Sequence, residues 1–244
     1  MIRNGSLGPL HLEGFDVTQT GHWTLTNDGH SVILQVGGGM SVSGGGLPDV
    51  YHTLQLHFHW GGPVTNGSEH TVDGRRYPME MHVVNMKSIH PNMSAALEDP
   101  TGLAVLGFFI DVTVFSCQTT KVKPFPLMSL LPKRNMSQYY RYDGSLTTPP
   151  CSQAVLWTLY EVPVYISWSQ LAQFTSQIFS TEEDAEQVTP LHNNFRHIHA
   201  TFSRVVSASR DARLLSGTAA PPLRPAASVH LLPFVLLGGL ASKL

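Results

Sequence analysis

Three histidines on two apolar stretches have the residue type and the spacing of a metal site. His57 and His59 lie two positions apart in residues 51–60, and His82 lies in residues 77–87. Successive side chains of a β-strand point to opposite faces, so two histidines two positions apart share a face. Three neutral imidazoles that leave a fourth position open form a catalytic zinc site. If the two stretches are neighbouring strands, the sequence predicts that these histidines bind Zn²⁺.

A hydrogen-bonding residue precedes one histidine in each stretch by two positions. Gln55 precedes His57, and Glu80 precedes His82. Metal-bound histidine usually donates its other ring N–H to a partner of this kind. We therefore expect Gln55 and Glu80 to orient the imidazoles. The alternative is that these histidines are hydrogen-bonded groups of the core or the surface.

Two other metal sites fit the sequence less well. Structural zinc sites favour closed sets of ligands that include cysteine, whereas the chain has only Cys117 and Cys151. A cupin site also contains His-x-His, but it needs a glutamate a few residues later, where Pro63 and Val64 stand. Both alternatives are disfavoured.

The elements that must position these residues are strands. The chain has 244 residues, of which 42% are apolar and only 13% charged, with 21 glycines and 17 prolines. Such a composition favours a turn-rich, mostly β domain with few helices. The net charge is −2, and no cluster of Lys and Arg indicates binding to nucleic acid.

Alternating or β-rich segments predict the strands, and one segment predicts a helix. Apolar residues recur at helical spacing in residues 167–178, with serines at the start that can cap a helix. The predicted strands are residues 31–36, 51–60, 77–87, 103–115, 154–164 and 204–207. The predicted fold class is α+β, mostly β.

Several longer motifs resemble a known family. Residues 55–61 read Gln-Leu-His-Phe-His-Trp-Gly, residues 67–74 read Gly-Ser-Glu-His-Thr-Val-Asp-Gly, and residues 144–151 read Gly-Ser-Leu-Thr-Thr-Pro-Pro-Cys. With Met-Glu-Met-His at 79–82 and Trp157 in order, the chain resembles the α-carbonic anhydrases from about residue 20 to 209. The resemblance implies one domain around a large, twisted, mostly antiparallel sheet. It also implies Zn²⁺ as cofactor and reversible hydration of carbon dioxide to bicarbonate and a proton.

The resemblance assigns roles to residues. His57, His59 and His82 match the zinc ligands, and Gln55, Glu80 and Asn194 match the residues that support them. Thr147 matches the hydroxyl that accepts a hydrogen bond from zinc-bound hydroxide, Glu69 the carboxylate that orients Thr147, and His30 the proton shuttle. Thr148 lines the same site. The residues that match the apolar pocket for carbon dioxide are Val84, Val105, Leu146, Val155 and Trp157.

The C-terminal residues have the pattern of a signal for a GPI anchor. Ser216, the candidate anchor site, begins a triplet of small residues; a Pro- and Ala-rich spacer follows, and then the apolar residues 229–240. The pattern predicts that the protein lies on the extracellular face of the plasma membrane and is attached to the membrane only by a lipid. Four sequons agree with secretion, at Asn4, Asn66, Asn92 and Asn135. The first residues of the chain do not form a secretory signal peptide.

The chain also departs from the family. We expect a carbonic anhydrase domain over residues 1–209 and a processed tail over residues 210–244. Relative to the family, an N-terminal segment is missing and the stretch near residues 116–129 is short. Cys151 resembles a cysteine of the GPI-anchored members whose partner lies in the missing segment. A non-catalytic binding module and a truncated, inactive variant are therefore the alternatives to an enzyme.

Overall fold

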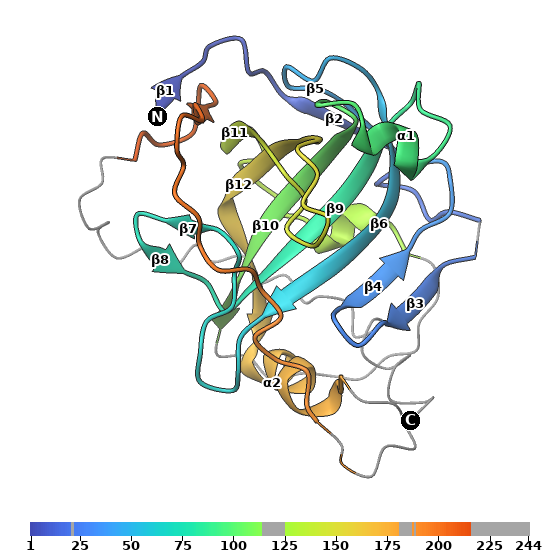
Figure 1. Ribbon diagram of the computed structural model, residues 1–244, viewed down its shortest axis with the longest axis vertical. Coiled ribbons are helices and arrows are strands. Elements are labelled where there is room, and N and C mark those ends of the chain that lie inside the picture. The colour runs from blue at the N-terminus through green and yellow to red at the C-terminus, as the bar shows by residue number, and fades with distance from the viewer. Residues whose placement is uncertain (21, 114–124, 181–186, 188, 216–244) are drawn as a thin grey trace.

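A computed structural model describes residues 1–20, 22–113, 125–180, 187 and 189–215. These residues form one twisted sheet of eleven strands and a separate hairpin (Figure 1). The main path of the sheet runs β1-β13-β11-β12-β10-β9-β6-β4-β3, and β5 joins β2 to β6 beside it.

The bounds of the elements follow chain order. The strands of the large sheet are β1 (Ile2–Arg3), β2 (Leu10–Glu13), β3 (Thr24–Asn27), β4 (Val32–Gln35), β5 (Ser41–Gly44), β6 (Tyr51–Trp60), β9 (Met79–Lys87), β10 (Leu103–Thr113), β11 (Tyr139–Gly144), β12 (Val155–Ser167) and β13 (Ser207–Ala208). The hairpin is β7 (Thr71–Val72) with β8 (Arg75–Arg76), and the helices are α1 (Met93–Leu97), the short 3-10 helix η1 (Leu127–Leu130) and α2 (Trp168–Gln177).

Long strands at the centre of the sheet hold the molecule together. β6 pairs with β9 and β9 with β10, both antiparallel, whereas β10 pairs with β12 in parallel. One face of these strands packs on α2, where the rings of Phe58 and Trp60 lie 5.4 and 5.3 Å from that of Phe174. All three rings are buried. Because alternate residues of β6 face the core, His57 and His59 are left on the opposite face.

The predicted helix at residues 167–178 is confirmed. Ser167 caps α2: its side chain accepts a hydrogen bond from the backbone N–H of Gln170, and the Gln170 side chain bonds back to the cap. Leu171 and Phe174 are buried, as the helical spacing predicts.

The strand predicted at residues 204–207 is shorter in the structure, and the one predicted at residues 154–164 is longer, since β12 ends at Ser167. The strand expected at residues 204–207 begins only at Ser207, because Arg204 turns back and donates to the carbonyl oxygens of Thr201 and Ala200. The strand expected at residues 103–115 runs as β10 to Thr113, and its last two residues lie outside the described ranges.

The predicted fold class is confirmed: strands dominate and most pairs are antiparallel, with β10–β12 and β1–β13 parallel. Within the described ranges no helix is long and apolar enough to cross a membrane.

Candidate metal centre

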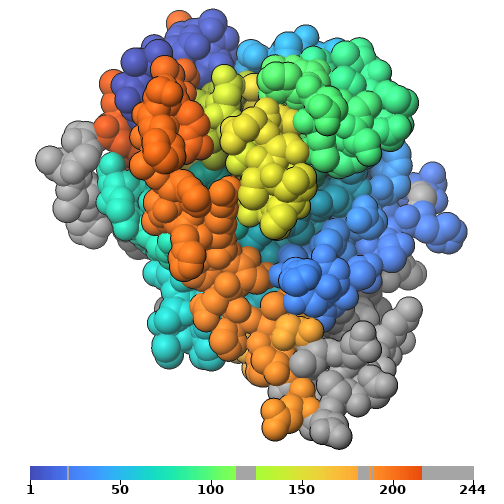
Figure 2. Space-filling view, in the orientation of Figure 1, coloured from blue at the N-terminus to red at the C-terminus, as the bar shows by residue number. Residues whose placement is uncertain are grey.

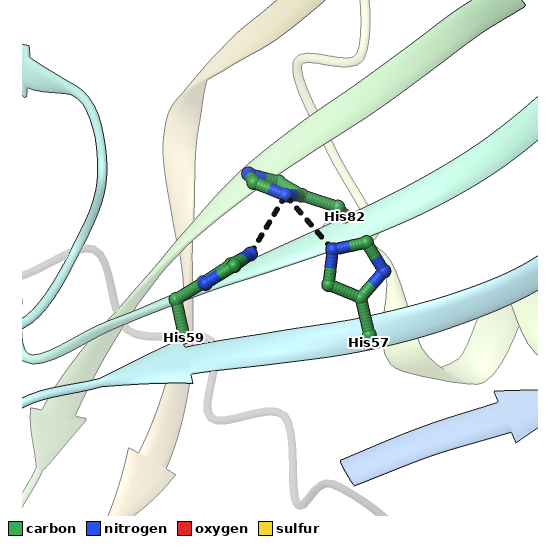
Figure 3. Close-up of side chains that lie close together, drawn as sticks. All are labelled: His57, His59 and His82. Carbon is green, nitrogen blue, oxygen red and sulfur yellow. Dashed lines mark hydrogen bonds between the residues drawn. The ribbon is translucent and has the colours of Figure 1, made fainter. Parts of the chain in front are cut away.

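The register between β6 and β9 brings the three histidines together. His57 lies directly opposite His82, and His59 lies opposite Glu80. Figure 3 shows the three imidazoles pointing toward one another from the two strands. Nδ1 of His82 lies 3.1 Å from Nε2 of His59 and 3.3 Å from Nε2 of His57.

The outward nitrogen of each ring contacts an oxygen that accepts a hydrogen bond. These contacts are His57 Nδ1 to Gln55 Oε1 at 3.0 Å, His59 Nδ1 to the carbonyl oxygen of Asn194 at 2.7 Å, and His82 Nε2 to Glu80 Oε1 at 2.7 Å. A neutral imidazole carries one proton, so each outward nitrogen is the donor. The inward nitrogens therefore direct three lone pairs at one another.

This donor set fits Zn²⁺. Three lone pairs that face one another repel unless a cation lies between them. Ligands at about 2.0–2.1 Å in a tetrahedron lie roughly 3.3 Å apart, close to the two separations between the histidine nitrogens.

Burial keeps two of these histidines neutral. Desolvation lowers the pKa of His57 well below its ordinary value, and the neighbouring histidines lower it further. Desolvation likewise lowers the pKa of His59, although Glu69 works in the opposite direction. Neutral imidazole is the form that binds a metal ion.

His70 belongs to the same network, although it was not predicted to. It donates from its backbone N–H to Oε2 of Glu80 at 2.8 Å, and its Nδ1 lies 2.6 Å from Oε1 of Glu80. Its Nε2 lies 2.5 Å from the hydroxyl of Tyr142. Burial opposes a charge on His70, but Tyr142 and Glu80 raise its pKa well above the ordinary value. Glu80 is fully buried, and His70 and His82 nevertheless hold its pKa well below the usual range.

A second group of possible metal ligands in the described part of the chain is His70, Glu80 and His82. The Glu80 oxygens already accept hydrogen bonds from both histidines. We interpret this group as the support of the first one. The sequence signal that could have indicated it is the position of His70 next to Glu69 within the 67–74 motif.

Glu69 is close to the histidines, but it is not bonded to Thr147. Glu69 Oε1 accepts from the backbone N–H of Arg196 at 2.7 Å and lies 3.6 Å from Nδ1 of His59. Glu69 Oε2 is buried and has no partner in the described structure. The Thr147 hydroxyl also makes no hydrogen bond within the described ranges. The expected contact between Thr147 and Glu69 is therefore not formed.

The five residues predicted to form an apolar pocket share one cluster. Val84, Val105, Val155 and Trp157 are buried in it, and Leu146 packs against it. The Trp157 ring lies 4.8 Å from that of His82, so the cluster forms an apolar wall beside the histidines.

Comparison with known proteins identifies the family. A family model described as eukaryotic-type carbonic anhydrase matches residues 1–210. The chain belongs to this family. It is therefore identified as an enzyme of the carbonic anhydrase type.

Named relatives agree with this carbonic anhydrase assignment. Mouse carbonic anhydrase 15 is 37% identical over 94% of this chain and 78% of its own length. Human carbonic anhydrase 12 is 37% identical over 84% of this chain, which spans 62% of that relative. Rabbit carbonic anhydrase 4 is 34% identical over 89% of this chain and 75% of its own length.

His30 and Thr148 are the remaining predicted site residues. His30 and Thr148 are exposed. The Asn194 amide donates to the carbonyl oxygen of His30 at 2.9 Å, so Asn194 links the His30 loop to His59. Neither the His30 imidazole nor the Thr148 hydroxyl forms a hydrogen bond in the described structure.

The predicted modification sites differ in exposure. Asn66, Asn92 and Asn135 are exposed and Asn4 is half-buried. Cys151 is a free thiol of intermediate exposure. Cys117, Ser216 and most of the short stretch near 116–129 lie outside the described ranges.

Proposed function

We propose that this chain catalyses the zinc-dependent, reversible hydration of carbon dioxide to bicarbonate and a proton. The observation that carries the proposal is the set of three inward histidine nitrogens, each fixed from behind by an acceptor oxygen. His57, His59 and His82 would hold the ion. Bound zinc supplies a water whose pKa falls to about 7, for which carbonic anhydrase is the standard example.

The apolar wall would hold the substrate. Carbon dioxide is uncharged, so Val84, Val105 and Val155 can contact it without leaving a polar group unpaired. Trp157 is fixed beside them because its ring N–H donates to the carbonyl oxygen of Ser145 at 3.1 Å. Leu146 and Thr148 follow in the same loop.

Glu69 and Thr147 would orient the attacking water oxygen. The backbone N–H of Arg196 holds one oxygen of Glu69 and leaves the other, buried oxygen free to accept. If the Thr147 hydroxyl donates its one proton to this oxygen, its own oxygen can only accept a hydrogen bond from the attacking water. The role therefore requires the Thr147 side chain to reach Glu69, a contact that this structure does not contain.

His30 would carry the proton to solvent. Its imidazole is exposed, and proton transfer to and from solvent is a common role of histidine. Asn194 keeps the His30 loop beside the histidines.

A lipid anchor on the extracellular face is the finer part of the proposal. It is supported by the tail pattern that begins at Ser216 and by the exposed sequons. A non-catalytic binding module is less well supported, since all three histidines, Glu69 and Thr147 are present.

The test uses the full chain, secreted with an added signal peptide. Zinc content and carbon dioxide hydration are measured on one sample, with and without a sulfonamide. We expect stoichiometric zinc and inhibitable activity, and loss of both in His82→Ala but not in His22→Ala, an exposed histidine of no assigned role. Zinc without activity would favour the binding module. Full zinc and activity in His82→Ala would disprove the ligand set.

A further inference from the structure

A cavity of about 330 Å³ lies next to the candidate metal centre. Residues 196–206, here called the strap, form one wall, and residues of β7 and β11 form two others. Figure 2 shows the strap in orange beside the teal segment that contains β7 and the violet N-terminal residues. Glu69 and Thr147 line the cavity, whereas none of the three candidate metal ligands does. The cavity therefore borders the metal centre without containing its ligands.

The charged side chains of the lining carry a net positive charge. Arg196 and Arg204 line the cavity, and neither guanidinium forms an ion pair in the part of the chain that the structure describes. Glu69 is the one acidic residue among the described residues that line it. One Glu69 oxygen accepts from the backbone N–H of Arg196, and the other is buried. Two guanidinium groups against one carboxylate favour an occupant with a single negative charge over a neutral molecule, a cation or a dianion.

Both guanidinium groups keep N–H donors for such an occupant. Nε and Nη2 of Arg204 donate to two carbonyl oxygens of the strap, at 3.0 and 2.8 Å, and its Nη1 makes no hydrogen bond within the described ranges. Nη1 of Arg196 donates to the carbonyl oxygen of Leu146 at 3.4 Å, and its Nη2 makes no hydrogen bond to any described residue. The Arg204 guanidinium lies 5.5 Å from the ring of Tyr142, another lining residue. A hydrogen bond from guanidinium to carboxylate is roughly twice as strong as one between neutral groups.

Apolar side chains make up another part of the lining. Val72 and Val206 line the cavity, and so does Ile198, which is 57% exposed. The strap also exposes Val205 and Phe202, which are 60% and 80% exposed. An exposed group of apolar side chains beside polar ones is typical of a binding site. The occupant therefore needs an apolar body next to its charge.

We propose that this cavity binds a small organic monocarboxylate, which is a single carboxylate group on an apolar body. The carboxylate accepts hydrogen bonds from Arg196 and Arg204, and the apolar body lies against Val72, Val206 and Ile198. The carboxylate supplies the single negative charge that the lining favours, and the apolar body distinguishes this ligand from bicarbonate. The site is additional to the proposed hydration of carbon dioxide and does not depend on it.

The test measures the binding of octanoate to the secreted, zinc-loaded full chain by ligand-observed NMR. Octanamide and octylammonium keep the apolar body and change the charge, whereas acetate keeps the charge and lacks the body. We expect octanoate to saturate with a dissociation constant below about 1 mM, and the other three probes to bind about tenfold more weakly or worse. Because carboxylates can also bind zinc, each titration is repeated with a small aliphatic sulfonamide on the metal. Octanoate should bind equally in both titrations.

Two arginine variants locate the carboxylate. Arg204→Gln should weaken octanoate binding by about tenfold or more and leave zinc content and melting temperature unchanged, which excludes misfolding. Arg134→Gln, at an exposed arginine that lines no part of the cavity, should bind octanoate like the parent. Val72→Trp fills the cavity and should weaken octanoate binding as well.

Four results would overturn the proposal. These are octanoate that does not saturate below about 1 mM, octanamide that binds as tightly as octanoate, displacement of octanoate by the sulfonamide, and equal octanoate binding by Arg204→Gln and Arg134→Gln. A chain without zinc or activity would instead overturn the proposed reaction, because octanoate binding at this cavity does not require the metal.

Discussion

The hydrogen bond that each outward ring nitrogen donates leaves the inward nitrogen with a lone pair that can bind a metal ion. Gln55 and Glu80 could be predicted as partners because each lies two positions from its histidine on the same strand face. The carbonyl oxygen of Asn194 could not be derived from spacing, since it lies 135 positions from His59 and only the fold brings it there. Its assignment rested on the family resemblance. The missed contact of His70 has the same cause.

Replacing Glu80 tests this support directly. Glu80→Gln removes the negative charge shared by His70 and His82. We expect zinc affinity to fall about 10–100-fold, the usual effect of losing such a partner. Competition with a chromophoric chelator measures it, and Glu98→Gln, at an exposed glutamate, is the matched control. Unchanged affinity would show that Glu80 does not act on the ligand.

The lowered pKa values of His57 and His59 predict how stability depends on pH without metal. Below about pH 6.5 these histidines take up protons in the unfolded chain but stay neutral in the folded chain. The free energy of unfolding should therefore fall as the pH drops below about 6.5, by up to roughly 1.4 kcal/mol per pH unit for each histidine. Urea titrations in chelator measure this slope.

Two variants test whether His57 and His59 cause this dependence of the free energy of unfolding on pH. The double variant His57→Gln/His59→Gln should flatten it, whereas His22→Gln should leave it as in the parent. Equal slopes in all three proteins would place the pH dependence elsewhere.

Among the elements, the long strands and α2 could be predicted, and the short edge strands could not. β6 and β9 carry enough residues for a pattern, whereas β1 and β7 have two each and show none. β11 was not predicted because its first three residues are all buried, so no alternation of apolar and polar residues marks it. The pairing order of the strands is a tertiary property that local patterns do not encode.

In the loop from β6 to β7, one added methyl group at Gly67 should strongly destabilise the fold. A Cβ on Gly67 would lie 1.9 Å from the backbone N of Gly61 and 2.1 Å from the backbone carbon of Trp60. Gly67→Ala must therefore displace the backbone that leads to Glu69. We expect the free energy of unfolding to fall by about 1–3 kcal/mol, measured in urea, and zinc affinity to fall with it.

Gly62→Ala in the same loop is the control. Its Cβ would meet only the Thr65 hydroxyl, at 3.1 Å, and a side chain can move away. We expect a much smaller loss. Equal losses in the two variants would mean that the loop gives way at Gly67 as easily as at Gly62.

The position of the metal centre in the sheet determines how strongly bound zinc stabilises the whole molecule. The histidines join β6 to β9, two long strands inside a sheet whose other face carries the core and α2. A ligand that binds only the folded chain stabilises it by about 2.7 kcal/mol at a hundredfold excess over the dissociation constant. Because the centre joins two strands inside the sheet and not at its edge, zinc should stabilise the entire domain.

This stabilisation can be measured by thermal unfolding with zinc and after chelation. We expect the melting temperature of the full chain to rise with zinc concentration, by the same amount for probes of the sheet and of α2. His82→Gln should abolish the increase, and His22→Gln should keep it. If zinc raised the melting temperature of His82→Gln as much as that of the parent, the ion would bind elsewhere. If α2 melted without regard to zinc, the sheet and α2 would not unfold as one unit.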